Sequence, residues 1–207
     1  HLKKNKVKKY KIVLEPAKKN TAPAVLASAL IKDIPKEQSL MFFPADQLIE
    51  KTNIFNAAIN KHKKNLNDQN VFIFGIKPTN PSSEYGYFLT KKIKGNINKV
   101  TKFIEKPKQS KAKQVIKKNG YWNSGIFIFE KDWFVNQSKN LDPLFFNKVK
   151  ASVKEGKKEK NLFYPESISF SSLKQDSFDH GFVEKCKDIS MIKLDAGWSD
   201  LGSWVSL

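Results

Sequence analysis

The sequence contains no arginine, although it carries 38 basic residues and a formal net charge of +18. Proteins that read nucleic-acid bases rely on the planar arginine side chain to contact guanine and phosphate at two points, whereas lysine offers only a point charge. Base-specific nucleic-acid binding is therefore disfavoured, and the lysines are expected to form a solvated surface. A basic nucleic-acid-binding protein stays open as the last alternative, and the salt dependence of filter binding would reveal it.

Cysteine and long apolar runs are also scarce. Cys186 is the one cysteine, which excludes an internal disulfide and fits a reducing cytosol. No apolar stretch approaches the roughly 18 residues that span a bilayer, and residues 1–11 lack the apolar segment of a signal peptide. The sequence therefore predicts a cytoplasmic protein with no membrane partner. It leaves the oligomeric state open, with a homodimer as one option.

The apolar residues that are present predict an ordered core. They make up 40% of the 207 residues, and phenylalanine alone contributes 16. A domain of this length buries roughly 70% of the surface that its unfolded chain exposes. No Gly/Ser-rich linker or internal repeat divides the chain, so we expect a single domain over residues 1–207.

Short apolar runs bounded by turn residues alternate with amphipathic segments in the first half of the chain. The runs predict strands at 11–14, 40–43, 71–76, 100–104, 125–129 and 190–194. The amphipathic segments predict helices at 21–34, 53–64, 111–118 and 143–153, the first with Thr21 as its N-cap. This pattern favours an open α/β sheet whose ligands gather at the carboxyl ends of the strands.

Two aspartates follow strands that lie far apart in the sequence. Asp46 ends the run LMFFPAD, and Asp200 lies in the segment DAGWSDLGSW. Two carboxylates from distant segments suit Mg²⁺, which takes oxygen ligands and is completed by waters and substrate phosphates. We therefore predict that Asp46 and Asp200 form a metal site. Taken alone, Asp46 is equally compatible with a turn or helix cap.

Polar groups at three further strand ends suit a sugar phosphate. Glu105 and Lys106 follow a strand directly, and a carboxylate can accept two sugar hydroxyls while a lysine contacts a phosphate. Asn123 lies in YWNSG, and Gly86 follows Tyr85 in EYGY, where the backbone is open to a ligand. A surface ion pair and polar turns are the alternatives for these segments.

A strand joins a helix N-terminus at LEPAKKNTAP, which contains Glu15, Asn20 and Thr21. Free backbone N–H groups at a helix start favour anionic or acceptor ligands. Each of these six segments is ambiguous by itself. Their order carries more information: LEPAKKNTAPA, FFPADQ, FGIKPTNPSSEYGY, FIEKP, WNSGIFIF and LDAGWSDLGSW.

The order and spacing of these motifs closely resemble those of bacterial mannose-1-phosphate guanylyltransferases, from Tyr10 to Leu207. The resemblance implies a Rossmann-like nucleotidyltransferase fold, with a largely parallel central sheet and helices on both faces. It implies that GTP and mannose 1-phosphate are the substrates and that GDP-mannose and pyrophosphate are the products, with Mg²⁺ as cofactor. A nucleotidyltransferase for another hexose 1-phosphate and a non-catalytic sugar-nucleotide-binding relative are the alternatives.

The resemblance also implies roles for individual residues. Asp46 and Asp200 would hold Mg²⁺, and together with Lys106, which would meet the sugar phosphate, they are the expected catalytic residues. Mannose would be positioned by the other residues of the strand ends, namely Glu105, Asn123, Gly86 and Tyr85. Glu15, Asn20 and Thr21 would lie near the guanine. Gln47 departs from the family pattern, because a histidine is usual there, and Lys19 replaces a usual arginine.

Nothing like the glycine-rich phosphate loop GGxGTR of the family occurs in this sequence. We therefore expect the first strand of the fold, that loop and its helix to lie upstream of His1, and the family's C-terminal extension to be absent. On this interpretation the 207-residue chain is inactive alone. The sequence leaves open the pathway that consumes GDP-mannose and whether an isomerase domain is attached.

Overall fold

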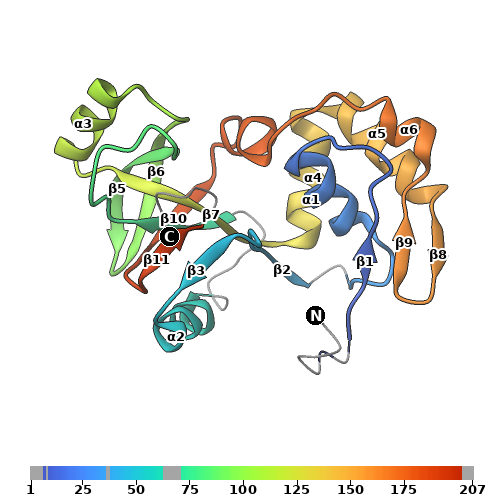
Figure 1. Cartoon of the computed structure of the whole chain (residues 1–207), viewed down its shortest axis with the longest axis horizontal. Helices are drawn as coiled ribbons and strands as arrows, with labels where there is room; N and C mark the ends of the chain where they lie inside the picture. The colour runs from blue at the N-terminus through green and yellow to red at the C-terminus, as the bar shows by residue number, and fades with distance from the viewer. Residues whose placement is uncertain (1–6, 8, 36–37, 63–70, 202–207) are drawn as a thin grey trace. The chain divides into compact units, whose positions relative to one another are not determined.

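The computed structural model describes residues 7, 9–35, 38–62 and 71–201. The chain forms two compact units, and each is built from two separate stretches (Figure 1). Unit 1 comprises His1–Pro35 and Val135–Phe182, and unit 2 comprises Lys36–Phe134 and Val183–Leu207. Because the chain crosses between the units three times, neither unit is a continuous segment. The single domain expected from the sequence stays a prediction.

Unit 2 contains a six-stranded sheet and a separate two-stranded ribbon. The sheet has the strand order β2-β7-β4-β10-β6-β5, with β5 also pairing with β7, and the ribbon joins β3 to β11. The strands are β2 (Ser39–Phe42), β3 (Gln47–Ile49), β4 (Val71–Ile76), β5 (Tyr87–Lys94), β6 (Ile97–Ile104), β7 (Tyr121–Glu130), β10 (Ile189–Leu194) and β11 (Trp198–Asp200). Two helices, α2 (Thr52–His62) and α3 (Gln109–Lys117), lie in the same unit.

The α/β fold is confirmed, but the central sheet is mixed, and its predicted largely parallel character is wrong for the described residues. Only β4 and β10 pair in parallel, while β7 lies between β2 and β4 and runs antiparallel to both. β5 and β6 form a hairpin around Gly95, so their pairing is antiparallel by necessity. A strand covered on both faces is apolar whichever way it runs, so the apolar runs could not report direction.

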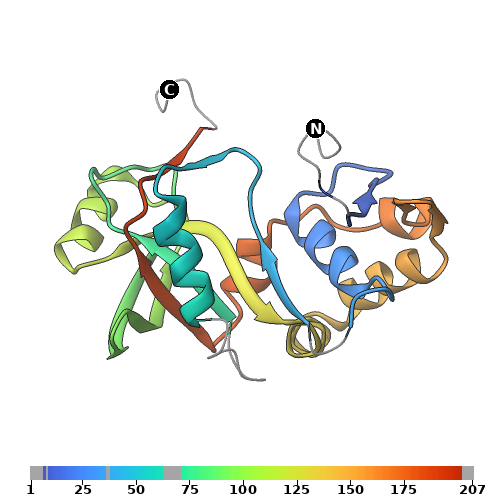
Figure 2. The same ribbon diagram turned by 90° about the horizontal axis from the view of Figure 1, so that it is seen from below.

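The core of unit 2 lies between this sheet and its helices. All six residues of β4 are buried, and Phe74 on one face contacts Phe55 of α2 at a ring-centroid distance of 5.4 Å. Val115 of α3 belongs to the same cluster. On the other face, Phe129 of β7 stacks on Phe134 at 4.3 Å, within α4 (Lys131–Leu141). Within unit 2, α2 and α3 therefore contribute to one core cluster on the sheet, and Figure 2 shows α2 beside the strands. Helices on both faces of the sheet stay a prediction.

Unit 1 consists of helices and a small three-stranded sheet with the order β1-β9-β8. Its strands are β1 (Ile12–Val13), β8 (Lys157–Glu159) and β9 (Leu162–Tyr164). Its other elements are α1 (Thr21–Leu30), α5 (Pro143–Lys154), α6 (Ser167–Ser171) and the π-helical turn η2 (Asp179–Val183), whose last residue belongs to unit 2. Most of α4 also belongs to unit 1.

The helix boundaries follow from capping chemistry. Asn20, and not the predicted Thr21, is the N-cap of α1, because its side-chain oxygen accepts from the Thr21 backbone N–H. The helix ends at Leu30, because the next residue is extended, so the predicted end at 34 is wrong. In α5, Asp142 caps the Phe145 N–H at 3.0 Å and a proline occupies the first turn.

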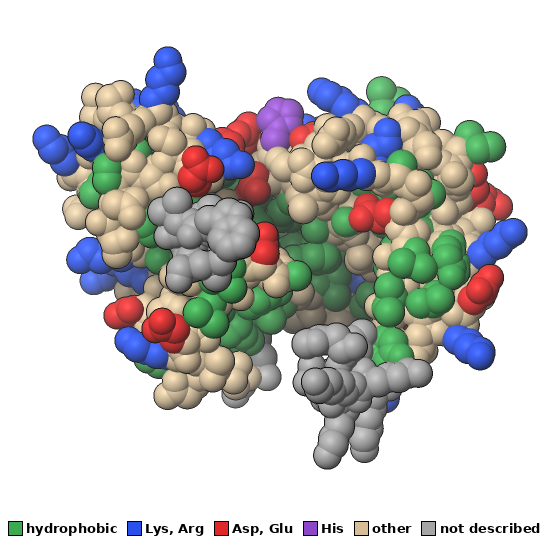
Figure 3. All heavy atoms as spheres, in the orientation of Figure 1, with side chains coloured by type: hydrophobic (Ala, Val, Ile, Leu, Met, Phe, Trp, Pro, Cys, Tyr) green, Lys and Arg blue, Asp and Glu red, His purple; other side chains and the backbone are tan. Residues whose placement is uncertain are grey.

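All six predicted strands are present, five with shifted ends and β4 with the predicted limits, and the helices predicted at 53–64, 111–118 and 143–153 correspond to α2, α3 and α5. Residues 63 and 64 of the first of these lie outside the described residues. No described helix has the length and apolar character needed to cross a membrane. On the face drawn in Figure 3, lysine side chains are dispersed among acidic and polar ones.

Phe74 offers a direct test of the unit 2 core. It is fully buried, and we expect Phe74→Ala to lower the free energy of unfolding by roughly 3–5 kcal/mol, because it removes apolar contacts and leaves a cavity. Urea denaturation followed by circular dichroism measures this. Ile93→Thr is the control, since Ile93 is 58% exposed on β5. Equal losses in both variants would contradict the assigned core.

Asp33 offers a pH-dependent test of unit 1. Its carboxylate pairs with Lys11 and with Lys158, whose Nζ lies 2.7 Å away. Hydrogen bonding to Lys11 and then to Lys158 lowers the pKa of Asp33 from 3.8 to about 2. The stabilisation is therefore complete above the unfolded-state pKa and is lost as the pH falls through about 2.

We expect the stability difference between the parent and Asp33→Asn to vanish as the pH is lowered from 5 to about 2, because the unfolded carboxyl titrates near 4. Thermal unfolding across this pH range measures it. The difference should also shrink in 1 M salt, because these charges are exposed. A difference that is constant with pH would rule out this role for Asp33.

Candidate functional site

The β3–β11 ribbon brings together the two aspartates predicted to bind metal. Asp200 in β11 pairs with Gln47 in β3, the residue directly after Asp46. The backbone N–H of Leu201 donates to the carbonyl oxygen of Asp46 at 2.8 Å. The pairing therefore places Asp46 and Asp200 on adjacent, hydrogen-bonded segments, although they are far apart in the sequence. Asp46 is exposed and Asp200 is half-buried.

Gln47 connects this ribbon to the WNSG segment. Its amide oxygen accepts from the indole N–H of Trp198 at 2.9 Å, and its amide nitrogen donates to the carbonyl oxygen of Ser124 at 2.5 Å. Gly125 is in the left-handed region at φ 72°, and a Cβ there would lie 3.3 Å from Pro44. One side chain thus acts as donor and acceptor at once, which a neutral histidine can also do. This gives a physical reason for the departure from the family pattern.

The donor set at the two aspartates fits Mg²⁺. Both groups supply carboxylate oxygens, which Mg²⁺ prefers, and no cluster of three or more His, Cys, Asp or Glu suited to a metal occurs among the described residues. Mg²⁺ is commonly held by one or two carboxylates, with waters and substrate phosphates completing its shell. The residue types at Asp46 and Asp200 are therefore compatible with Mg²⁺, and their metal role stays a prediction.

The residues predicted to hold a sugar converge in the same unit. Gly86 is so close to Glu105 that a Cβ on Gly86 would lie 2.8 Å from the carboxylate oxygen Oε2. The carbonyl oxygen of Gly86 accepts from the Asn123 backbone N–H at 2.8 Å. The side-chain oxygen of Asn123 in turn accepts from the Gly125 N–H at 2.8 Å. The chain therefore brings a carboxylate, an amide and a bare backbone segment together.

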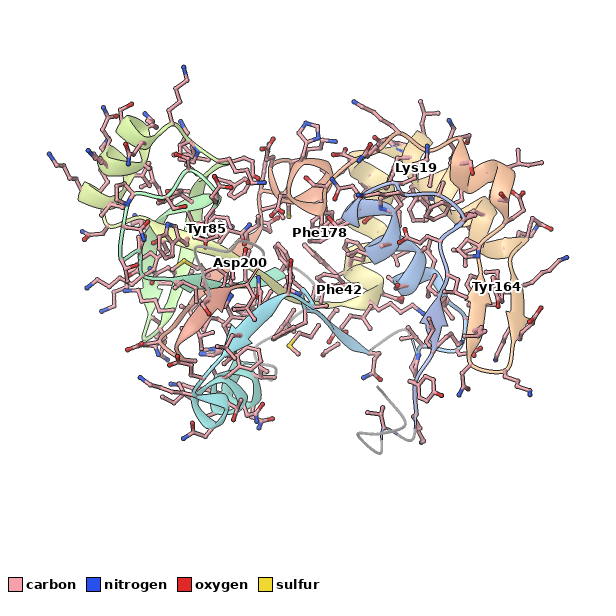
Figure 4. The ribbon with its side chains drawn as sticks, in the orientation of Figure 1. Lys19, Phe42, Tyr85, Tyr164, Phe178 and Asp200 are labelled. Carbon is pink, nitrogen blue, oxygen red and sulfur yellow. The ribbon has the colours of Figure 1, made fainter. Side chains whose placement is uncertain are left out.

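Three aromatic rings support this arrangement. The Tyr85 ring lies 4.9 Å from that of Trp122 and 5.5 Å from that of Trp198, both with edge-to-face geometry. Trp122 precedes Asn123, and Trp198 shares β11 with Asp200. The aromatic cluster therefore connects the segment predicted to hold a sugar to the segment predicted to bind metal. Figure 4 labels Tyr85 and Asp200 within unit 2. Edge-to-face pairs of this kind are stabilising beyond their buried area.

Lys106 leaves the end of β6 in an unusual backbone conformation. Its φ is 36°, in the left-handed region that non-glycine residues rarely adopt, and the following Pro107 is buried. Such strain costs roughly 1–3 kcal/mol and persists only where surrounding structure enforces it. The side chain is exposed. The turn therefore separates the direction of Lys106 from that of Glu105, as expected for neighbours that contact different parts of one ligand.

The residues predicted near the base belong to unit 1. Asn20 has φ 67° and ψ −168°, a combination that is nearly restricted to glycine. The Thr21 hydroxyl oxygen accepts from the Phe178 backbone N–H at 2.8 Å, and the Ala22 N–H donates to the Asp176 carbonyl at 3.1 Å. The start of α1 is therefore held by the 176–178 segment. The Thr21 hydroxyl has a structural role, which the sequence did not reveal.

Glu15 follows β1 in the same unit, and the surrounding protein raises the pKa of its carboxyl by reducing its solvation.

Two features of unit 2 were not predicted from the sequence, namely the double contact of Gln47 and the packing of Trp198 on Tyr85. Both lie inside the motifs that were identified. A signal for them was present in the tryptophans of WNSG and GWSD, since indole N–H groups usually find an acceptor when they are buried.

Gln47 can be tested without any substrate. We expect Gln47→Leu to shift the indole N–H resonance of Trp198 and to lower the free energy of unfolding by roughly 1–3 kcal/mol, because it leaves buried polar groups unpaired. Two-dimensional ¹H–¹⁵N NMR and urea denaturation measure these effects. Gln47→His keeps a donor and an acceptor and should retain most of the stability. An unchanged indole resonance in Gln47→Leu would exclude the contact.

The fold is that of the nucleotidyl transferases. The chain belongs to the nucleotidyl transferase family, since the family model of that description matches residues 1–207. It is 33% identical over 205 residues to the mannose-1-phosphate guanylyltransferase of Escherichia coli, and this match covers 95% of the chain and 44% of that protein. The chain thus spans less than half the length of this relative.

Two solved structures share the fold. A Helicobacter pylori structure described as mannose-6-phosphate isomerase has a TM-score of 0.85 and 29% identity, covering 96% of this chain and 79% of that one. A Thermus thermophilus structure described as mannose-1-phosphate geranyltransferase has a TM-score of 0.82 and 25% identity, covering 94% and 56%. The descriptions of both proteins refer to mannose phosphates.

Proposed function

We propose that the protein is a mannose-1-phosphate guanylyltransferase, which converts GTP and mannose 1-phosphate to GDP-mannose and pyrophosphate. The observation that supports this most strongly is the convergence of two carboxylates, a lysine and a sugar-type polar cluster in unit 2 of a nucleotidyl transferase family member. The similarity to the Escherichia coli guanylyltransferase supports the choice of mannose and guanine. In this reaction a phosphate oxygen of mannose 1-phosphate attacks the α-phosphorus of GTP. The bond to the β-phosphate breaks, and pyrophosphate leaves with the electron pair.

Asp46 and Asp200 hold Mg²⁺ in this proposal. The bound ion supplies charge neutralisation between the two phosphate groups that must approach each other. No general base is needed, because the attacking phosphate oxygen is already ionised. The rate enhancement then depends on positioning and charge neutralisation.

The remaining residues of the unit 2 site orient the sugar phosphate. Glu105 accepts hydrogen bonds from hexose hydroxyls, the Asn123 side chain contributes an amide, and the backbone at Gly86 allows close approach. Lys106 places its ammonium beside the phosphate and offsets its negative charge. The Tyr85 ring bounds the sugar position on the side of Trp122 and Trp198. In unit 1, we assign Glu15, Asn20 and Thr21 to the region that receives the guanine.

A substrate panel tests the proposed function on the full-length protein. Pyrophosphate release is measured with GTP, ATP, UTP and dTTP, each combined with mannose 1-phosphate and with glucose 1-phosphate. We expect the highest kcat/KM for GTP with mannose 1-phosphate. A higher value for another pair would assign a different nucleotidyltransferase activity. Absence of turnover with every pair, together with retained sugar-nucleotide binding, would assign a non-catalytic binding protein.

Asp200→Asn tests the metal role. We expect turnover to fall by two or more orders of magnitude while folding is nearly unchanged, because the change removes charge from a ligand and keeps its shape. Steady-state kinetics and thermal unfolding measure the two effects. Asp188→Asn is the control, since Asp188 is an exposed carboxylate paired with Lys99 in the same unit. Activity of Asp200→Asn within a factor of two of the parent would rule out the metal role.

Gly86→Ala tests the sugar position. The added methyl would lie 2.7 Å from the Phe103 ring and 2.8 Å from Glu105, so the carboxylate must move. We expect at least a tenfold higher KM for mannose 1-phosphate with little change in the KM for GTP. Gly95→Asn is the control, because nothing lies within 4 Å of that position and asparagine tolerates its positive φ. Equal increases in both KM values would contradict the assignment.

A further inference from the structure

A cavity of about 850 Å³ lies in unit 2, and its lining includes none of the residues assigned to the metal or the sugar. It is bounded by α2, by residues 77–79 after β4, by the end of β10, by residues 195–198 and by Tyr121. Its volume falls within the range of small-molecule binding sites. Because α2 covers one side and the ends of two parallel strands form another, the cavity lies where α/β proteins commonly bind ligands.

The lining combines an apolar surface with an excess of positive charge. Ile54, Ile192 and Leu194 provide apolar surface. Three lysines line the cavity, Lys61, Lys77 and Lys193, against a single acid, Asp195. Lysine ammonium groups are suited to phosphate, and partial exclusion of water strengthens the attraction. The cavity is therefore complementary to a molecule that carries a phosphate group and a less polar portion.

One lysine of the cavity already lies against an aromatic ring. Lys193 lies over the Tyr121 ring, with its Nζ 5.3 Å from the ring centroid. A lysine held over an aromatic face loses less conformational freedom when an anion binds, because its side chain is already ordered. Lys77 is exposed, so its ammonium can reach a ligand without rearrangement of the core. These two lysines are the first candidates for phosphate contacts.

His62 bounds the cavity on the side of α2. Its side chain is only 4% exposed and belongs to the cavity lining. Its ring lies beside that of Phe72, with 6.3 Å between the ring centroids. Burial, followed by the charge of Lys61, lowers the pKa of His62, so the positive charge of the cavity at pH 7 comes from its lysines.

Trp198 connects the cavity to the site described above. It lines the cavity, its N–H donates to Gln47, and its ring packs on Tyr85. Asp200 follows two residues later in the same strand. A ligand that contacts the Trp198 ring in the cavity is thus in contact with the strand that carries a metal ligand.

We propose that this cavity binds a small soluble phosphorylated metabolite that carries a ring or an apolar group, at a site separate from that of Asp46 and Asp200. The phosphate lies between Lys77 and Lys193, and the apolar portion lies against α2 and the end of β10. Binding at this site does not depend on the proposed guanylyltransferase activity.

Phenyl phosphate is a suitable probe, because it combines a phosphate with an apolar ring. It is titrated into the full-length ¹⁵N-labelled protein, and two-dimensional NMR follows the backbone resonances of the cavity and the Trp198 indole. We expect saturable shifts at Lys77, Thr79, Lys193 and Trp198, with an affinity at least tenfold higher than that of inorganic phosphate, because the ring is buried. Equal affinities for the two probes, or shifts spread over surface lysines outside the cavity, would overturn the proposal.

Variants locate the probe. The single variants Lys77→Gln and Lys193→Gln should each weaken phenyl phosphate binding about tenfold or more, which corresponds to loss of one charge-assisted contact. Lys91→Gln, an exposed lysine of β5 outside the cavity, should leave binding unchanged. Parent-like affinity in a folded Lys77→Gln variant would overturn the proposal, and this variant changes an exposed residue, so folding is preserved.

Asp200→Asn separates this proposal from the proposed function. We expect this variant to bind phenyl phosphate with the affinity of the parent, even though the proposed reaction is lost. Loss of the cavity shifts in a folded Asp200→Asn protein would place the probe at the metal site and would overturn the separate site. If the parent protein shows the cavity shifts but has no transferase activity, the cavity assignment stands and only the proposed function is refuted.

Discussion

The site in unit 2 depends on one short antiparallel pairing, in which β3 and β11 bring Asp46 beside Asp200. Neither strand is long, and both are half-exposed, so the pairing alone is a weak structure. Gln47 reinforces it, because its amide binds the Trp198 indole on one side and the Ser124 carbonyl on the other. The same contacts place the segments of Asp46 and Asp200 beside the segment that contains Asn123. A small number of half-buried polar contacts therefore holds the segments that carry the charged groups.

Much of this arrangement follows from the sequence, because strand ends carry the reactive groups. The run VFIFGI was identified as a buried strand and is β4 with the same limits. Asp46 and Asp200 were paired on chemical grounds, and the ribbon brings their segments together. Glu105, Asn123 and Gly86 were predicted from separate motifs, and Gly86 lies next to both of the others. Their functional roles, like the cytoplasmic location and the homodimer option, stay predictions.

Other features could not be read from the sequence, for physical reasons. Strand direction leaves no trace in a strand covered on both faces, so the insertion of β7 between β2 and β4 was missed. The short strands β3 and β11 have no apolar run of their own, and their pairing is decided by contacts of Gln47 and Trp198 with distant segments. Thr21 was predicted as a helix cap, but Asn20 caps α1, and the Thr21 hydroxyl binds the 176–178 segment. Except for the local cap by Asn20, these features depend on contacts between segments that are distant in the sequence.

The central claim is that one divalent ion binds between Asp46 and Asp200. The most direct measurement uses Mn²⁺ as a paramagnetic substitute for Mg²⁺, added with GTP to the ¹⁵N-labelled full-length protein. We expect the strongest broadening of amide resonances at Gln47 and Leu201, and its loss in the Asp46→Asn, Asp200→Asn double variant. Broadening centred on another segment, or broadening at Gln47 and Leu201 that survives in the folded double variant, would contradict the claim.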